Sequence, residues 1–225
     1  MAKAAARGGK LEIRPLSPAR AEDVKTITAS TWGSTCWDLW WRSTKPFTTS
    51  GAPKDEKERQ RRAILAKLAR RRHAPVLVAY RDGEPVGFVS LGPRADYERV
   101  RANKSTQPVD DVAAWVIPCI TVRKADRGQG IALDLLKAAT RYAGAHGAPA
   151  IEGYPRADEK KRFDDGSVYM GTPSLFRRAG FREVRGIQTG LPRYYAPRVT
   201  MRATCAPTRR PRTSSTSRRA SAAAR

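Results

Sequence analysis

The sequence predicts an α/β (α+β) fold, and three observations support this prediction. Short apolar runs that are typical of strands alternate along the chain with longer, helix-type patterns. Hydrophobic residues make up 40% of the 225 residues, which is enough for one domain with a hydrophobic core. An Asp82-Gly83 step lies between two of the strand-like runs and predicts that they form a hairpin.

The first half of the chain is expected to form a strand, two helices and the hairpin. These elements are predicted at residues 11–14, 18–30, 55–72, 76–80 and 86–91. The first strand alternates apolar and polar residues and ends at Pro15. Ser17 can cap the first helix, which Pro18 begins, and the second helix is highly charged with a thin apolar stripe. Gly83 suits the hairpin because glycine tolerates the positive φ of such turns.

The second half begins with a polar segment, residues 93–111, that predicts a loop or a short helix. Further elements are predicted at residues 115–122, 129–145, 150–154, 173–179, 181–187 and 198–202. The strand at 115–122 is the most apolar, and its Pro118 cannot donate a hydrogen bond. We therefore expect a bulge or a break in pairing there. The helix that follows is amphipathic, and Gly144, Gly147 and Pro149 end it.

Composition limits the partners without selecting one. The 44 Lys and Arg against 21 Asp and Glu give a formal charge of +23, which raises the local concentration of nucleotides, nucleic acids and acidic membranes. Three cysteines without close pairs predict neither a disulfide framework nor a zinc site, so we expect a cytoplasmic protein without a metal. No secretory signal is expected at the N-terminus, and no apolar run is long enough for a membrane span.

The two ends of the chain are expected to lie outside the domain. Residues 1–10 predict a flexible leader, and residues 11–202 predict the folded domain. Residues 203–225 contain no acidic and no large apolar residue, so this tail is expected to be disordered. A solvated basic tail is favoured over an arm that binds nucleic acid.

The segment Arg127-Gly128-Gln129-Gly130-Ile131-Ala132 predicts a phosphate site. It joins an apolar strand to an amphipathic helix. Its glycines let backbone N–H groups point into one concavity, and the helix N-terminus adds partial positive charge. The segment is not a P-loop, which needs Gly-Lys-Ser/Thr at the helix start. A dinucleotide-binding turn needs a third glycine where Leu133 stands.

The same segment resembles the acyl-CoA loop of the GNAT superfamily of N-acyltransferases, Arg/Gln-x-x-Gly-x-Gly/Ala, through Arg127, Gly130 and Ala132. The order of predicted elements from residue 11 to residue 202 is also similar to that family. Residues 37–42, 83–88 and 152–155 resemble a group of bacterial GNAT proteins. The resemblance implies a mixed, mostly antiparallel sheet of about six to seven strands flanked by about four helices.

The resemblance further implies that acetyl-CoA is the acyl donor. Backbone N–H groups from Gly128 to Ala132 would hold its pyrophosphate, and Ile120 and Val122 would pair with its pantetheine arm. A backbone N–H near Ile120 would polarise the thioester carbonyl. Ser174 is a further candidate for a hydrogen bond to pantetheine.

An amine would attack the thioester directly, and it needs a base because a lysine-type amine has a pKa of about 10.4. Glu152 is the first candidate for the base, and Asp110 and Asp111 are the second. Pairing of Glu152 with one of the many arginines is an equally good interpretation. The expected acceptor is an amine on a small molecule or on a protein.

The leaving thiolate usually receives its proton from a tyrosine in this family, but Phe176 stands at the matching position. This leaves Tyr169, Tyr154 or water as the donor, or it makes the chain a sensor that binds acyl-CoA with little turnover. The tryptophan-rich residues 32–41 lie where the family builds its acceptor pocket, and they predict either core or pocket wall.

The sequence therefore predicts an N-acetyltransferase that acts on an unidentified amine. An acyl-CoA sensor is the alternative, and a basic protein associated with nucleic acid is less favoured. The acyl chain length stays open, as does the choice between a monomer and a homodimer.

Overall fold

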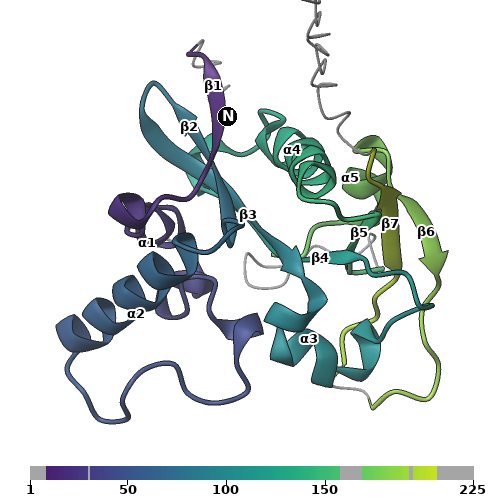
Figure 1. Ribbon diagram of the computed structural model, residues 1–225, viewed down its shortest axis with the longest axis horizontal. Helices are drawn as coiled ribbons and strands as arrows, with labels where there is room; N and C mark the ends of the chain where they lie inside the picture. Colours follow the sequence, from purple (N-terminus) through teal and green to yellow (C-terminus); the bar gives the residue numbers. More distant parts are fainter. Residues whose placement is uncertain (1–8, 30, 158–168, 193–194, 207–225) are drawn as a thin grey trace, which may run out of the picture.

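A computed structural model describes residues 9–29, 31–157, 169–192 and 195–206. Seven strands form one sheet in the order β1-β2-β3-β4-β5-β7-β6 (Figure 1). The strands are β1 (Leu11–Pro15), β2 (Val76–Arg81), β3 (Glu84–Pro93), β4 (Trp115–Val122), β5 (Ala150–Gly153), β6 (Arg182–Arg185) and β7 (Thr200–Thr204). Within the described ranges the α-helices are α1 (Asp23–Thr28), α2 (Lys54–Ala69), α3 (Glu98–Ala102), α4 (Ile131–Ala145) and α5 (Pro173–Arg178).

The sheet is mixed and mostly antiparallel, which confirms the predicted fold class. Every neighbouring pair of strands is antiparallel except β4 and β5, which are parallel. The last strand, β7, lies between β5 and β6, so β6 forms the edge.

The predicted break in pairing at Pro118 is confirmed on both sides of β4. Toward β5, the parallel pairing covers only Trp115 to Ile117 and ends one residue before the proline. Toward β3, the register shifts between Ser90 and Gly92, opposite the same stretch of β4. Because proline lacks a backbone N–H, β4 leaves β5 at this point and continues beside β3 alone.

The predicted hairpin is also confirmed. Its two turn residues, Asp82 and Gly83, have φ values of 51° and 84°. Positive φ at both central residues is the mark of a type I′ turn, whose twist matches that of the flanking strands.

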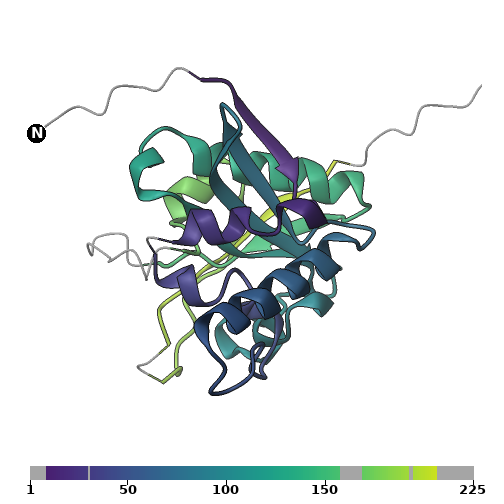
Figure 2. The ribbon, with the colours of Figure 1, turned by 90° about the vertical axis from the view of Figure 1, so that its left-hand side faces the viewer.

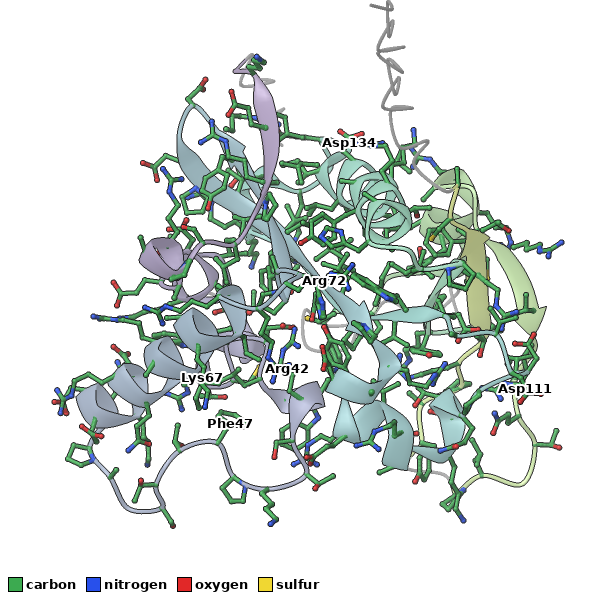
Figure 3. All side chains as sticks on the ribbon, in the orientation of Figure 1. Arg42, Phe47, Lys67, Arg72, Asp111 and Asp134 are labelled. Atoms are coloured by element: carbon green, nitrogen blue, oxygen red, sulfur yellow. The ribbon has the colours of Figure 1, made fainter. Side chains whose placement is uncertain are left out.

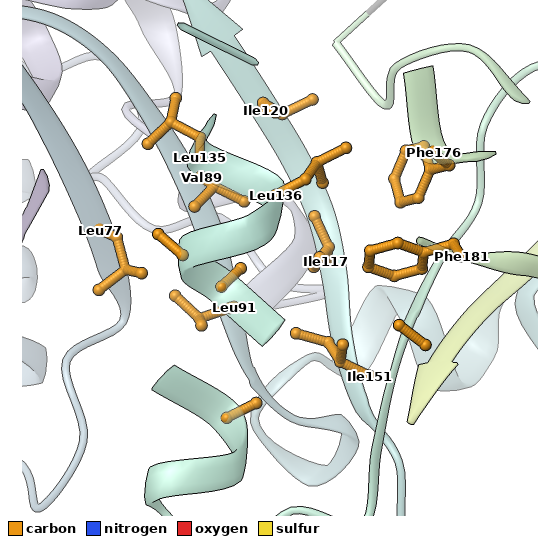
Figure 4. Close-up of a cluster of buried hydrophobic side chains, with 14 of the residues drawn as sticks. Leu77, Val89, Leu91, Ile117, Ile120, Leu135, Leu136, Ile151, Phe176 and Phe181 are labelled. Carbon is orange, nitrogen blue, oxygen red and sulfur yellow. The ribbon is translucent and has the colours of Figure 1, made fainter. Parts of the chain in front are cut away.

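Helices cover both faces of the sheet. In Figures 1 and 2, α1 and α2 lie on one face, and α4 and α5 lie on the other. The strand β2 is buried on both sides, since Leu77 packs in the cluster under α4 and Val78 in the cluster under α1 and α2. Figure 4 shows the cluster under α4, in which Leu135 and Leu136 of the helix pack with Val89 of β3 and Ile117 of β4. This core fixes the start of α4 relative to the end of β4.

The predicted start of the tail at Ala203 is wrong by a few residues. Ala203 and Thr204 pair with β5, and the N–H of Cys205 donates to the Pro149 carbonyl at 3.0 Å. Cys205 is buried, so the ordered chain continues past residue 202. Residues 207–225 and 1–8, which carry the rest of the tail and leader predictions, lie outside the described residues. None of the described helices is long and apolar enough to cross a membrane.

Candidate functional site

The glycine-containing segment forms a sharp bend between β4 and α4. Gly128 and Gly130 have φ values of 77° and 80°, which residues with a Cβ rarely adopt. Gly130 is the N-cap of α4, and its carbonyl accepts hydrogen bonds from the N–H groups of Leu133 (2.9 Å) and Asp134 (3.1 Å). The backbone N–H groups that precede Leu133 have no hydrogen-bond partner inside the helix. Together with the positive end of the helix dipole, they are available to an anionic ligand.

The bend is held in place by its own side chains. The Arg123 Nε donates to Asp126 Oδ2 at 2.8 Å, and the Arg127 Nε donates to the Val122 carbonyl at 3.1 Å. Asp126 is buried, so the Arg123 pair forms largely out of water. The loop is therefore built before a ligand arrives, which reduces the entropy cost of binding.

A cleft of about 560 Å³ opens at this loop, a volume usual for a small-molecule site. It is lined by β4, the loop, the first turn of α4, the start of α5, and the segment after α1. Seven of the predicted cofactor residues line it: Ile120, Val122, Arg127, Gly128, Gly130, Ile131 and Ala132.

Two predicted cofactor residues do not line the cleft. The side-chain oxygen of Gln129 accepts a hydrogen bond from Arg81, the last residue of β2. The Ser174 hydroxyl lies 3.0 Å from the hydroxyl of Thr172, which caps α5 and does line the cleft. Thr172 is thus better placed than Ser174 to meet a ligand.

The gap that β4 leaves beside β5 is crossed by the segment around Tyr169. The N–H of Ile120 donates to the Tyr169 carbonyl at 2.6 Å, and the N–H of Arg156 donates to the Gly171 carbonyl at 3.4 Å. The N–H that was expected to meet a thioester is therefore engaged within the chain in this structure. Tyr169 lines the cleft, and burial raises the pKa of its hydroxyl, which keeps it protonated at neutral pH.

Phe176 belongs to the core. Its side chain is fully buried, and its ring meets that of Phe181 edge-on with the centroids 4.9 Å apart. No hydroxyl is available at this position, so Tyr169 is the tyrosine of the described residues that the cleft offers as a proton donor.

Glu152 lies in an ion-pair network outside the cleft lining. Its carboxylate is 1% exposed; Oε2 accepts from Arg94 at 2.6 Å and Oε1 from Arg202 at 2.9 Å. Asp110 also pairs with Arg202, at 2.7 Å, on the solvent side. Both oxygens of Glu152 are occupied by arginine donors. This geometry favours the interpretation of Glu152 as a paired structural carboxylate and not as a base. Asp111 is exposed and does not line the cleft either.

Two acidic residues are among those that line the cleft: Asp126, which pairs with Arg123, and Asp38, which was not predicted and whose side chain is 0% exposed. Its Oδ2 accepts a hydrogen bond from the Ser90 hydroxyl at 2.8 Å and one from the Arg42 guanidinium at 3.2 Å. Arg42, labelled in Figure 3, also donates to the Tyr97 hydroxyl at 2.7 Å. Burial raises the pKa of Asp38 to about 6, although the charge of Arg42 acts in the opposite direction.

The tryptophans around Asp38 serve packing. Trp37 is buried and its Nε1 donates to the Ser34 carbonyl at 2.9 Å; Trp41 is buried as well. Trp40 is exposed, with the Arg99 guanidinium 3.8 Å from its ring centroid. The side chain of Trp32 lies outside the described part of the chain. Of the two predicted alternatives, core is confirmed for Trp37 and Trp41, while Cys36 and Asp38 of the same stretch are among the residues that line the cleft.

The structure is thus an α/β protein with a glycine-containing bend at a helix N-terminus, beside a strand that has separated from its neighbour. The chain belongs to the acetyltransferase (GNAT) family, whose model matches residues 34–160. Membership of this family makes it an N-acyltransferase.

Solved structures show the same fold. A ribosomal-protein-alanine N-acetyltransferase from Brucella melitensis is 20% identical with a TM-score of 0.53, over 86% of this chain and 99% of that chain. An acetyltransferase of the GNAT family from Bacillus cereus is 13% identical with a TM-score of 0.52, over 87% and 98%. One from Streptococcus pneumoniae is 16% identical with a TM-score of 0.51, over 87% and 99%. Among curated proteins, none matches the sequence.

Proposed function

We propose that this protein transfers an acetyl group from acetyl-CoA to an amine by direct attack of the amine on the thioester. The observation that carries the proposal is the loop of Gly128 and Gly130 at the N-terminus of α4, which lines a cleft of about 560 Å³. A pyrophosphate there would receive backbone N–H donors and the charge of Arg127.

The remaining groups have roles set by their positions. The β4 edge at Ile120 and Val122, which has no β5 partner, would pair with the pantetheine arm. For the thioester to use the N–H of Ile120, the Tyr169 carbonyl would have to give up the hydrogen bond that it makes there. The Tyr169 hydroxyl is the proton donor that we propose for the leaving thiolate.

The acceptor class stays at the level of an amine, either on a small molecule or on a protein. The name of the Brucella protein gives an alanine of a ribosomal protein as its own acceptor, and the identity of 20% carries only the fold to this chain.

A calorimetric titration of acetyl-CoA tests the proposal. The wild-type protein is expected to bind with a micromolar Kd, and the Gly130→Glu variant to lose binding, because a carboxylate at the loop repels the pyrophosphate. Gly51→Glu is the matched control: Gly51 has a similar φ of 75°, open space around a Cβ, and no place in the cleft lining. It is expected to bind like wild type. Thiol release across a panel of amines then measures transfer.

Absence of binding by the wild type would refute the proposal. If the Gly51→Glu control loses binding equally, backbone strain and not the loop position explains the loss of acetyl-CoA binding in Gly130→Glu.

An acyl-CoA sensor is a second candidate. It is favoured by Phe176, which offers no hydroxyl at the family's tyrosine position, and by the hydrogen bond between Ile120 and Tyr169 across the gap. Binding of acetyl-CoA without thiol release for any amine would support this function. A nucleic-acid partner receives less support, because basic side chains of α2 such as Arg59 and Arg62 pair with nearby carboxylates.

A further inference from the structure

We propose that the groove between β1 and α4 is a docking site for an acidic peptide segment of a partner protein, which adds to the edge of the sheet as a further strand. β1 forms one edge of the sheet, and α4 runs beside it (Figure 1). Residues of both elements line a groove of about 620 Å³. This groove shares no lining residue with the cleft at the glycine loop, so the inference does not depend on the proposed acyl transfer.

The first observation is the free hydrogen-bonding edge of β1. The N–H of Leu16 donates to the Val76 carbonyl at 2.9 Å, in the register in which β1 pairs with β2. Hydrogen-bonded pairs alternate along antiparallel strands, so the residues two and four positions before Leu16 bond inward to β2. The backbone N–H and C=O groups of Leu11 and Ile13 therefore point away from β2. Within the described ranges these groups have no other hydrogen-bond partner.

The second observation is an apolar surface on the α4 side of this edge. The side chains of Leu11 and Ile13 line the groove and are partly buried against the core cluster that contains Leu77. The charged residues between them, Glu12 and Arg14, project from the other side of the strand and pair with each other. An added strand would cover the exposed parts of the two apolar side chains, which favours binding by about 25 cal/mol per Å².

The third observation is the charge on the α4 wall, which selects an acidic occupant. Lys137 and Arg141 are exposed, line the groove, and form no ion pair with the described residues. They lie about 6 Å apart along the helix axis, and alternate residues of a strand lie about 7 Å apart. Two acidic residues at alternate positions of an added strand would therefore meet both cations. Asp134 also lines the groove, one turn earlier, and the three charges leave the wall net positive.

Charge and backbone geometry argue against other occupants. A second copy of this chain would bring a formal charge of +23 against an equal charge. Residues 207–225 contain arginines and no acidic residue, so they carry the same sign as the wall. A nucleic acid has phosphates but no backbone N–H and C=O groups at the spacing of a strand. Strand addition to a sheet edge is a known mode of peptide recognition, in which main-chain hydrogen bonds give affinity and side-chain contacts give specificity.

The experiment titrates the full chain with the peptide acetyl-Leu-Thr-Glu-Thr-Glu-Thr-Leu-amide by calorimetry at about 0.15 M salt. In a strand, its leucines and glutamates share one face and its threonines the other. Wild type is expected to bind with a Kd of about 100 μM or lower. Lys137→Glu is expected to weaken binding by about tenfold or more, because it replaces an attraction by a repulsion.

Lys67→Glu is the matched control for charge. It is the same change at an exposed lysine of α2, labelled in Figure 3, that has no ion pair with the described residues and does not line the groove. This variant is expected to weaken binding by less than about twofold. A peptide with lysines in place of the glutamates is expected not to bind.

Ile13→Pro tests strand addition separately from charge. It removes the outward N–H of Ile13 and leaves the inward hydrogen bonds to β2, as proline at a sheet edge does. Peptide binding is expected to weaken by about tenfold or more, and Ile13→Ala, which keeps the N–H, is expected to weaken it less. A second measurement does not depend on the folding of a variant: methylation of the backbone nitrogens of both glutamates, which face the edge in an antiparallel pairing, is expected to abolish binding to wild type.

The outcomes decide the proposal without reference to acyl transfer. No binding of the peptide by wild type would overturn it. Equal losses in Lys137→Glu and Lys67→Glu would show general attraction by a basic protein and would also overturn it. Unchanged binding of the methylated peptide would exclude strand addition. If the protein alone sediments as a dimer that Ile13→Pro dissociates, a second copy occupies the groove and the proposal is wrong. Acetyl-CoA binding is expected to be unchanged in all these variants, so the proposed function stands or fails separately.

Discussion

Asp38 is expected to lower the stability of the folded protein at neutral pH, and replacing it by asparagine tests this. Its pKa is 3.8 in an ordinary environment and about 6 in the folded protein. Between these values the folded state binds more protons than the unfolded state, so stability falls as pH rises. The contribution of the protonated form is fully present below about pH 4 and is lost above about pH 6. A shift of about two pKa units corresponds to about 3 kcal/mol.

The measured quantity is the free energy of unfolding of Asp38→Asn minus that of wild type, from urea titrations at several pH values. We expect this difference to rise by about 3 kcal/mol between about pH 4 and about pH 7. Asparagine resembles the protonated acid at every pH, and the attraction between Arg42 and the ionised Asp38 is already contained in the net pKa shift. Other differences between an amide and a protonated acid add an offset that does not depend on pH. The test therefore depends on how the difference in the free energy of unfolding changes with pH, and not on the absolute stability of the variant.

Asp110→Asn is the control with the opposite sign. The Arg202 guanidinium lowers the pKa of Asp110, so wild type gains stability above the ordinary pKa and loses it as pH falls. If the difference for Asp38→Asn stays flat or falls with pH, Arg42 stabilises the ionised Asp38 more than burial destabilises it. Asp38 would then form a stabilising ion pair, and the reasoning from burial would be refuted.

Further variants test the other assignments. Glu152→Gln is expected to cost about 3 kcal/mol of stability, measured by urea titration, because it leaves the largely buried Arg94 without its Glu152 counter-ion, while Arg202 keeps Asp110. The same variant should keep the pH profile of thiol release; a profile that loses its acid limb would restore Glu152 as the base. Gly153→Ala would place a Cβ 2.2 Å from the Phe176 ring and should lower stability by about 1–3 kcal/mol. Gly186→Ala, whose nearest contact is 3.5 Å away, should change stability little, and equal effects would contradict the packing argument.

Local chemistry explains why much of the fold was predictable. The hairpin at Asp82-Gly83 depends on two adjacent residues that accept positive φ, so two letters of sequence predict it. The break at Pro118 depends on one missing N–H group. The start of α4 after Gly130 follows from a glycine N-cap and an amphipathic pattern, and these also predicted the loop residues that line the cleft.

The roles of the carboxylates were not predictable in the same way. Glu152 looked like a base because it lies on a strand next to β4, but Arg94 and Arg202 come from distant parts of the chain and occupy both of its oxygens. The position of Ala203 in β7 likewise depends on pairing with β5, across about fifty residues of chain, and not on its own composition.

The sequence by itself determined the elements, the glycine loop and the family, because each depends on residues within a few positions of one another. Only the tertiary structure decided the surroundings of each acid. Asp38 is buried by a left-handed backbone conformation, a hydrogen bond from Ser90 on β3 and an ion pair with Arg42. Proton affinity depends on burial and neighbouring charge, and those are properties of the packed molecule.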